Sequence, residues 1–221
     1  MEYRVKIIEK EWLTRNVIQL RLEKPSDFSF IAGQAIEVAV DNPRFYGERA
    51  PFTLTCLNTE NYLELILKVY PDHNGMTLEL SNLNKGEYLI ISNAWDSFTD
   101  MGAGMFIAGG TGVTPFVALL RQHKATNNLS ESKMLFANQK AEDIFLYEEF
   151  RQILGKNFVN ILSREKTERF LFGHIDSGIL ESQIDNRKQP FYICGPDNFA
   201  EQIRGLLLEL SIDKDLINIG Y

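Results

Sequence analysis

The 221-residue chain has room for one large domain or two small ones, and its 44% hydrophobic residues argue against a disordered protein. Its net charge of -7 argues against a general nucleic-acid surface, which needs clustered Lys and Arg. The sequence has no stretch as apolar as a membrane span and no signal-peptide core. We therefore expect a cytoplasmic protein with neither nucleic acid nor membrane as a partner.

The metal-binding residue types are few. Only Cys56 and Cys194 occur, too few for a four-cysteine iron–sulfur cluster or a structural zinc. The three histidines, His73, His123 and His174, show no metal-ligand spacing. No metal site is expected. Spacing alone does not exclude a disulfide, although a cytosolic chain of this size does not need one.

The first half is typical of short strands. Tyr3, Val5 and Ile7 alternate with polar residues, and turn signals such as Asn74-Gly75 follow the later strands. Those strands are predicted at 17–22, 35–40, 52–57, 62–70 and 88–92, with one helix at 76–83. Several short strands separated by turns indicate a small antiparallel barrel or sandwich.

The second half alternates between strand and helix patterns. Strands are predicted at 105–109, 133–138, 157–162, 190–194 and 215–220, and helices at 115–123, 144–154, 178–184 and 198–210. This alternation predicts a doubly wound parallel sheet with helices on both faces. We expect two domains, residues 1–98 and residues 99–221, with a turn-rich boundary near 95–104.

A glycine-rich loop, GGTG at 109–112, follows the first strand of the second half. Gly110 and Gly112 would let the backbone approach a pyrophosphate closely. Thr114 is predicted as the N-cap of the next helix and Pro115 as its first residue, so that free N–H groups would face an anion. Taken alone, the loop also fits an ordinary tight turn or a methyltransferase that uses S-adenosylmethionine.

Five motifs occur in the order found in a known family. They are FIAGQ (30–34), APFTLT (50–55), NGMTLEL (74–80), GTGVTP (110–115) and CGPDNF (194–199). Together they resemble the ferredoxin–NADP reductase family, in its stand-alone flavodoxin or ferredoxin reductase form. The resemblance implies an FAD-binding β-barrel, a domain that binds NADPH (NADH being possible), and hydride transfer from nicotinamide C4 to flavin N5. It also implies flavodoxin or ferredoxin as the electron acceptor. Separately from the resemblance, we expect a monomer.

By this resemblance, Phe52 packs on the flavin ring and the Thr53 hydroxyl bonds to it. Without the resemblance, both would be ordinary strand residues. The flavin-binding candidates are Arg49, Phe52, Thr53, Val69, Tyr70, Gly75, Met76 and Thr77. One departure stands out, because Ala50 occupies the position where the family has the arginine that pairs with the flavin pyrophosphate. Arg49 would point to the other face of a regular strand unless a bulge re-aims it, and Arg44 or Lys68 could substitute.

On the nucleotide side, the resemblance places Cys194 in the nicotinamide pocket beside Thr53. Ser163 and Arg164 would contact the 2′-phosphate of NADPH, with Lys166 as a second cation, although a solvated charged loop explains these residues equally simply. The nucleotide-binding candidates are Gly110, Thr111, Gly112, Thr114, Pro115, Asn138, Gln139, Ser163, Arg164, Lys166, Cys194, Gly195 and Pro196.

The last residue, Tyr221, resembles the terminal tyrosine that stacks on the flavin in plant-type reductases. The residues expected to act in catalysis are then Thr53, Cys194 and Tyr221. Alternatively, Tyr221 is part of a loosely ordered chain end and has no role in the site.

Two other functions stay open. One is a reductase that passes electrons to oxygen, free flavin or a monooxygenase partner. A flavin reductase or a monooxygenase-partner reductase of this kind would use NADH. The other is a non-catalytic nucleotide-binding module. An acidic acceptor would need a local basic patch, for which Arg4, Lys6, Lys10 and Arg15 are the candidates.

Overall fold

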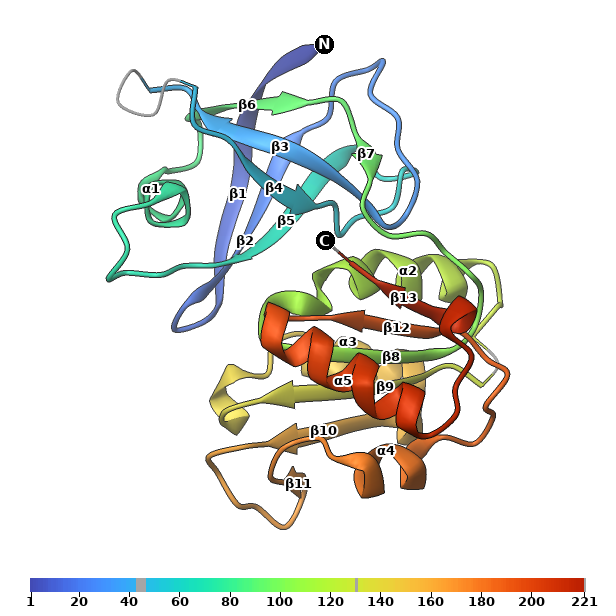
Figure 1. Cartoon of the computed structure of the whole chain (residues 1–221). Helices are drawn as coiled ribbons and strands as arrows, with labels where there is room; N and C mark the ends of the chain where they lie inside the picture. The colour runs from blue at the N-terminus through green and yellow to red at the C-terminus, as the bar shows by residue number, and fades with distance from the viewer. Residues whose placement is uncertain (43–46, 130, 221) are drawn as a thin grey trace.

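The computed structural model describes residues 1–42, 47–129 and 131–220. It contains an antiparallel sheet built from the first half of the chain and a parallel sheet built from the second (Figure 1). The expected fold class is therefore confirmed: an antiparallel near-barrel is followed by a parallel α/β domain.

The N-terminal strands follow one another along the sheet in the order β4-β3-β6-β1-β2-β5, with β7 paired to β3. A single bridge between Leu54 and Leu65 joins the two ends and nearly closes a barrel. Helix α1, Met76–Asn82, packs on the barrel core through Met76 and Leu80. The strands are β1 Glu2–Thr14, β2 Val17–Glu23, β3 Gln34–Val40, β4 Ala50–Thr53, β5 Tyr62–Lys68, β6 Tyr88–Ser92 and β7 Trp95–Asp96.

The C-terminal strands are all parallel and lie in the order β11-β10-β9-β8-β12-β13. Successive strands run outward from β8 in one direction and then from β12 in the other. The space between β8 and β12 is therefore the topological switch point, where open α/β sheets bind ligands. The strands are β8 Met105–Gly109, β9 Lys133–Asn138, β10 Phe158–Leu162, β11 Leu171–Phe172, β12 Phe191–Cys194 and β13 Ile217–Ile219.

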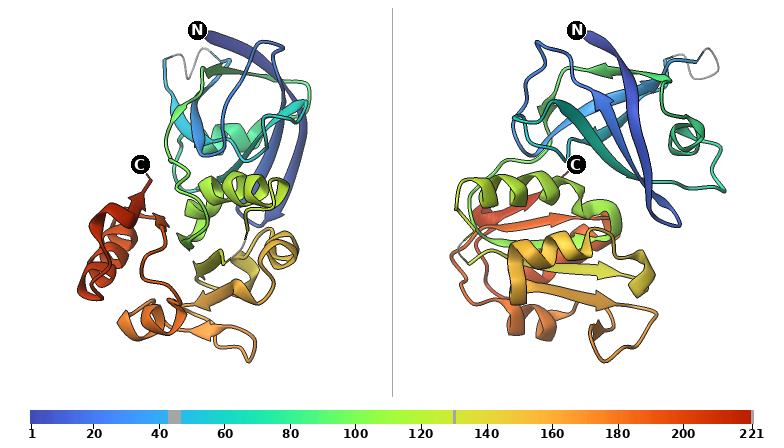
Figure 2. Two further views of the ribbon diagram at one scale, coloured as in Figure 1. Left: turned by 90° about the vertical axis from the view of Figure 1, so that its right-hand side faces the viewer. Right: turned by 180° about the vertical axis from the view of Figure 1, so that it is seen from behind.

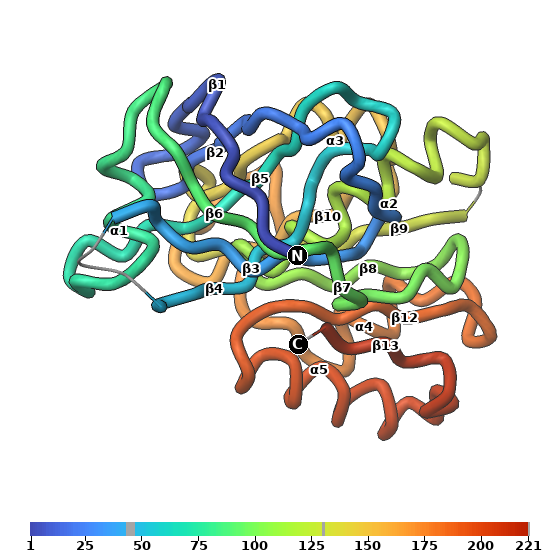
Figure 3. Tube along the Cα trace, turned by 90° about the horizontal axis from the view of Figure 1, so that it is seen from above, coloured from blue at the N-terminus to red at the C-terminus, as the bar shows by residue number. Residues whose placement is uncertain are grey.

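Helices cover both faces of this sheet, as predicted. Helices α2 and α3 lie on one side of the sheet, and α4 and α5 lie on the other (Figure 2). Each pair of helices shares one hydrophobic cluster with the sheet. Their bounds are α2 Thr114–Ala125, α3 Tyr147–Leu154, α4 Ser177–Gln183 and α5 Asp197–Glu209. Seen from above, β12, β13 and α5 lie to one side of the barrel (Figure 3).

Several details differ from the sequence-based expectation. The strand predicted at 52–57 is β4, which ends at Thr53. Strands β7 and β11 were not predicted, because two residues each are too few to show an alternating pattern. Helix α3 begins at Tyr147 rather than at 144, because Leu146 adopts a left-handed conformation with φ of 53° that a continuing helix cannot contain.

The outward face of β5 is buried, although β5 is the last strand of the barrel sheet. Leu63, Leu65 and Leu67 point into the barrel core. The alternate residue Ile66 belongs instead to a hydrophobic cluster formed mostly by the C-terminal domain, Phe116 included. The two domains therefore share a hydrophobic cluster along this strand.

The linker between the sheets is held by a polar cluster around Asp100. Both carboxylate oxygens of Asp100 lie 2.9 Å from Nε2 of the buried His123 on α2. The Gly102 amide donates to Asp100 over 2.8 Å, and the Tyr192 hydroxyl bonds to the Gly102 carbonyl over 2.8 Å. The hydrogen bond from His123 holds the pKa of Asp100 below its ordinary value of 3.8, although partial burial opposes the shift.

We predict that Asp100→Asn lowers the free energy of unfolding near neutral pH by about 1 kcal/mol, since a partly exposed charge-assisted bond is lost. Because the folded-state pKa is depressed, this stabilisation is complete above pH 3.8 and disappears as the pH falls below it. Urea titrations of both proteins between about pH 5 and pH 3 measure the effect. A difference that stayed constant across that range would contradict the role assigned to the Asp100 carboxylate.

Candidate functional site

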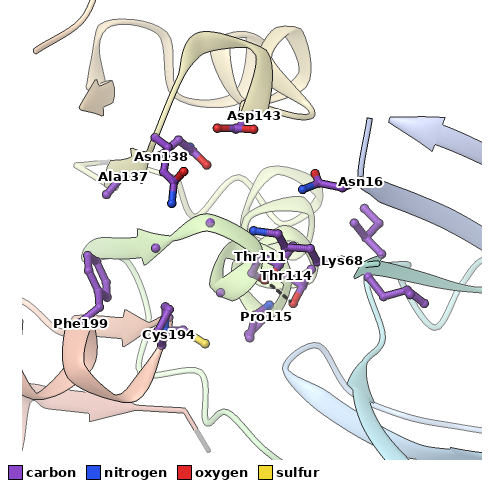
Figure 4. A pocket seen from close by; sticks show the side chains of 18 of the residues that line it. Asn16, Lys68, Thr111, Thr114, Pro115, Ala137, Asn138, Asp143, Cys194 and Phe199 are labelled. Atoms are coloured by element: carbon purple, nitrogen blue, oxygen red, sulfur yellow. Dashed lines mark hydrogen bonds between the residues drawn. The ribbon is translucent and has the colours of Figure 1, made fainter. Parts of the chain in front are cut away.

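A cleft of about 770 Å³ runs between the two domains (Figure 4). The barrel lines it with the ends of β4 and β5 and with the β1–β2 hairpin, and the C-terminal domain lines it with the loops after β8, β9, β10 and β12. Of the residues expected in the site, the cleft brings together Phe52, Thr53, Tyr70, Thr77, Gly110, Thr111, Gly112, Thr114, Pro115, Asn138, Gln139, Ser163, Cys194, Gly195 and Pro196.

The glycine loop forms a 3₁₀ turn, Gly110–Val113, directly before α2. Gly110 has a φ of +55°, and a Cβ atom there would meet nothing within 4 Å. Gly110 therefore leaves open space in the cleft. A Cβ atom on Gly112 would instead lie 2.4 Å from the Cys194 carbonyl oxygen, so the close approach at this glycine is to the neighbouring loop.

The prediction that Thr114 is the N-cap of helix α2 is wrong. Thr114 is the first helical residue and Pro115 the second, while Val113 is the N-cap. The Thr114 hydroxyl donates to the Thr111 carbonyl oxygen over 3.0 Å and does not accept from the helix amides. The preceding 3₁₀ turn explains the difference, because it already gives Val113 helical backbone angles.

Cys194 ends β12 beside this loop. Burial raises the pKa of its thiol to about 11, so the side chain stays a neutral thiol at physiological pH. Such a group is a small, uncharged wall for the cleft. Cys56 is buried in the barrel core, where burial raises the pKa of its thiol to about 12.

On the barrel side, the cleft is lined by half-buried Phe52 and Thr53. Farther along the chain, Tyr70 stacks on His73 with ring centroids 5.7 Å apart, and the Lys68 ammonium lies 5.6 Å from the centroid of the Tyr70 ring. Figure 4 shows the Lys68 side chain directed into the cleft.

Some flavin candidates lie elsewhere. Arg49 pairs with Glu2 over 2.6 Å and is not among the residues that line the cleft. Val69 and Met76 are buried in the barrel core, and Gly75 does not line the cleft. Three cations are candidates to replace the arginine missing at position 50. Lys68 lines the cleft and Arg49 does not, while Arg44 lies outside the described residues.

The adenosine side of the expected site is only partly assembled. Asn138 and Ser163 line the cleft at the ends of β9 and β10, whereas Arg164 and Lys166 are exposed and do not line it. The Asn138 Nδ2 atom is buried and has no hydrogen-bond partner. A buried donor without a partner is costly, so a ligand oxygen at this position would satisfy it.

Tyr221, the remaining candidate, lies outside the described residues. The preceding Gly220 donates to the Ile193 carbonyl oxygen over 3.2 Å and packs so closely on Phe98 that a Cβ atom could not be accommodated. The end of β13 is therefore held near the junction of the domains.

Several residues at the cleft were missed or not assigned to it by the sequence reasoning. Arg15, in the β1–β2 hairpin, lines the cleft and forms ion pairs with Glu142 and Asp143 of the other domain over 3.5 and 3.7 Å. Asn16 and Phe199 also line the cleft. No motif signals Arg15 or Asn16, because only the packing of the two domains brings them to the cleft. Phe199 is the last residue of the CGPDNF motif, but it was not chosen as a candidate.

The described residues include no group of three or more His, Cys, Asp or Glu arranged to hold a metal ion. None of the helices among these residues is both long enough and apolar enough to cross a membrane.

Two family models match almost the whole chain. One, an FAD-binding domain, matches residues 2–101, and the other, an oxidoreductase NAD-binding domain, matches residues 106–205. The first match covers the near-barrel and the second covers β8 to α5. The chain therefore consists of an FAD-binding domain followed by an NAD-binding domain. It belongs to the ferredoxin reductase-like superfamily of FAD- and NAD(P)-binding reductases.

The similar proteins come from several kinds of reductase. The chain is 31% identical over 169 residues to cytochrome b5 reductase 4 of Xenopus tropicalis, covering 69% of this chain and 32% of that protein. It is 25% identical over 235 residues to the reductase component of propane 2-monooxygenase from Mycolicibacterium goodii, covering 98% of this chain and 66% of that protein. The chain thus spans about a third of the first relative and just under two thirds of the second.

Among solved structures, the flavohem-like FAD/NAD-binding domain of nitric oxide dioxygenase from Vibrio cholerae O1 biovar El Tor has a TM-score of 0.87 at 21% identity. The match covers 98% of this chain and 96% of that one. At this identity, the likeness concerns the fold.

We predict that Gly112→Ala destabilises the protein by about 1–3 kcal/mol and weakens nucleotide binding, because the new methyl group overlaps the Cys194 backbone. For stability alone, Gly110→Ala is the matched comparison, since its methyl group meets no protein atom within 4 Å and only the positive φ adds strain, about 1–2 kcal/mol. Thermal unfolding and titration with NADP⁺ and NAD⁺ measure both effects. Equal nucleotide affinity for Gly112→Ala and wild type would show that the two loops tolerate displacement.

Proposed function

We propose that the protein is an FAD-dependent NAD(P)H oxidoreductase that passes electrons to a separate acceptor. The observation that carries this proposal is the single cleft in which Phe52 and Thr53 of the barrel face the glycine loop and Cys194 of the second domain. The proposed division of the chain is residues 1–98 for FAD and 99–221 for the nicotinamide nucleotide.

The residues at the cleft fit cofactors that carry phosphates. Gly110 leaves room for a close ligand, the Asn138 amide offers an unused donor, and Lys68 brings a positive charge. Lys68 is our candidate for the charge that the arginine at position 50 supplies elsewhere in the family. Phe52 would pack against the flavin ring, Thr53 would donate or accept a hydrogen bond at its edge, and Thr77 would lie at its phosphate end.

The chemistry that the cofactors supply, when bound, is hydride transfer from nicotinamide C4 to flavin N5. This chain contributes orientation and exclusion of water. The neutral Cys194 thiol adds no competing charge beside the site, and the glycine loop holds the nucleotide opposite the barrel. The proposal also retains Tyr221 as a residue that covers the flavin.

We predict that purified protein supplied with FAD is yellow and is bleached by NADPH or NADH in the absence of air. Absorbance at the flavin band, followed anaerobically, measures the reaction. If the protein bound flavin but neither nucleotide bleached it, the enzyme proposal would fail. If it bound a nucleotide and took up no flavin, the non-catalytic module would be the better description.

We further propose a preference for NADPH, carried by Ser163 and Arg164. Arg164 is exposed next to Ser163, within reach of the adenosine end of the cleft but outside its lining, so it would have to move onto a 2′-phosphate. Glu165, next in sequence, accepts from the Ala141 amide over 2.8 Å and ties this loop to the one after β9.

Arg164→Ala should reduce the ratio of kcat/KM for NADPH over NADH by roughly ten- to a hundredfold, because a charge-assisted bond to phosphate contributes about 1.5–3 kcal/mol. The exposed Lys124 on α2 gives the control variant, Lys124→Ala, which should leave the ratio unchanged. An unaltered ratio in Arg164→Ala would mark the segment as a solvated loop.

Flavodoxin or ferredoxin is our first choice of acceptor, on the family resemblance. The proposed basic docking patch gains little support. Arg4 pairs with Asp41, Lys10 bonds to the carbonyls of Ser81 and Leu83, and Arg15 pairs with Glu142. The relative from Mycolicibacterium goodii is the reductase component of a monooxygenase and matches 98% of this chain, which supports an oxygenase component as the second candidate.

A further inference from the structure

The domain interface contains a buried ion pair that joins strand β5 of the barrel to helix α2. The Glu64 side chain is only 1% exposed, and its Oε1 atom lies 2.6 Å from Nη1 of Arg121. The same Nη1 atom donates to the Thr55 carbonyl oxygen over 2.8 Å. Two further bonds, of 2.6 and 2.9 Å, run from Nε and Nη2 of Arg121 to the Glu149 carboxylate on α3.

These bonds occupy the guanidinium on two sides. One side faces α3 of its own domain, and the other faces two segments of the barrel. Glu64 is held in turn by the Thr55 hydroxyl over 2.9 Å and by Arg21, its cross-strand neighbour on β2, over 3.3 Å. Because the guanidinium is planar and its donors are fixed in a fork, the arrangement specifies direction as well as distance.

Neither Glu64 nor Arg121 lines the cleft, but each belongs to an element that does. Thr55 comes two residues after Thr53, and Glu64 shares the outward face of β5 with Ile66 and Lys68, both at the cleft. Arg121 belongs to the helix that begins directly after the glycine loop. A movement of Arg121 relative to Glu64 would therefore shift the glycine loop relative to Phe52 and Thr53.

We propose that Arg121 and Glu64 are positioning residues that set the separation of the flavin-binding and nucleotide-binding walls for hydride transfer. The proposal rests on the proposed reductase function. It assigns the two residues no contact with either cofactor. Misplacement of reacting groups by about 1 Å can slow a reaction by about a hundredfold, so a small change in domain placement would be visible in the chemical step.

The test compares Arg121→Met with Arg21→Met. Both arginines bond to the Glu64 carboxylate, but Arg21 does so within the barrel and Arg121 does so across the interface. With saturating nucleotide, flavin reduction followed by stopped flow should slow about ten- to a hundredfold in Arg121→Met. Arg21→Met should stay within about threefold of wild type, and the nucleotide affinity and flavin content of both variants should be close to those of wild type.

Two further variants distinguish a loss of domain positioning from a failure to fold. Arg121→Lys keeps the charge but loses the fork, and it should remain slow. Glu64→Gln nearly preserves shape and should also be slow, which decides the matter if Arg121→Met does not fold. Wild-type rates in folded Arg121→Met or Glu64→Gln, or equal slowing in Arg121→Met and Arg21→Met, would overturn the proposal.

A second measurement needs no turnover. Nitroxide labels attached through Ser29→Cys and Ser182→Cys, both exposed and one in each domain, report the interdomain distance in a Cys194→Ala background. The distance distribution should broaden or shift with Arg121→Met and stay unchanged with Arg21→Met. Identical distributions would overturn the proposal. If wild type is not reduced by either nucleotide, the reductase function fails on its own, while the labels still show whether the pair fixes the domains.

Discussion

The burial of the outward face of strand β5 is the constraint on which the site depends. A barrel strand normally has one face in the core and one in solvent, but here both are covered, one by the barrel and the other by the second domain. Ile66 supplies the apolar contact and Glu64 the ionic one. With the β4 end and β5 on one side and the loops of the parallel sheet on the other, the cleft exists only because these faces meet.

Burial of the Glu64–Arg121 pair is not primarily a source of stability. Two charges lose hydration when they are buried, and their attraction offsets that cost only when the remaining hydrogen-bonding groups are satisfied. Here the carboxylate and the guanidinium both have several partners, including the Thr55 hydroxyl and carbonyl. Such a network restricts how the two surfaces can pack, whereas a purely apolar contact would tolerate sliding. Removing Arg121 would leave the buried Glu64 carboxylate with Arg21 as an ionic partner, so the cost should be smaller than the about 3–5 kcal/mol typical of an unpaired buried charge.

The cleft combines two kinds of glycine that look identical in the sequence. Gly110 leaves space for a ligand, and Gly112 lets two loops of the sheet touch. The loop after β8 and the segment after β12 are adjacent because their strands meet at the point where the sheet order reverses. The buried Nδ2 atom of Asn138 at the same edge has no hydrogen-bond partner within the protein and is therefore a free donor toward a ligand. This is the expected property of a preformed binding site.

Local patterns were enough to determine the two-part fold. Alternation with turn signals predicted the antiparallel half, strand–helix alternation predicted the parallel half, and both follow from backbone periodicity within a few residues. The ordered motifs also located most of the cleft, since the ends of parallel strands meet at one edge of the sheet. Tertiary structure alone decided that Arg49 pairs with Glu2, that Lys68 faces the cleft and that Glu64 is buried against Arg121. In the sequence, Glu64 is one polar residue in an apolar strand. The residues near it in the sequence do not indicate that Arg121, on a helix of the other domain, will pair with it. Contacts of that kind depend on how two finished domains pack, and no local periodicity records them.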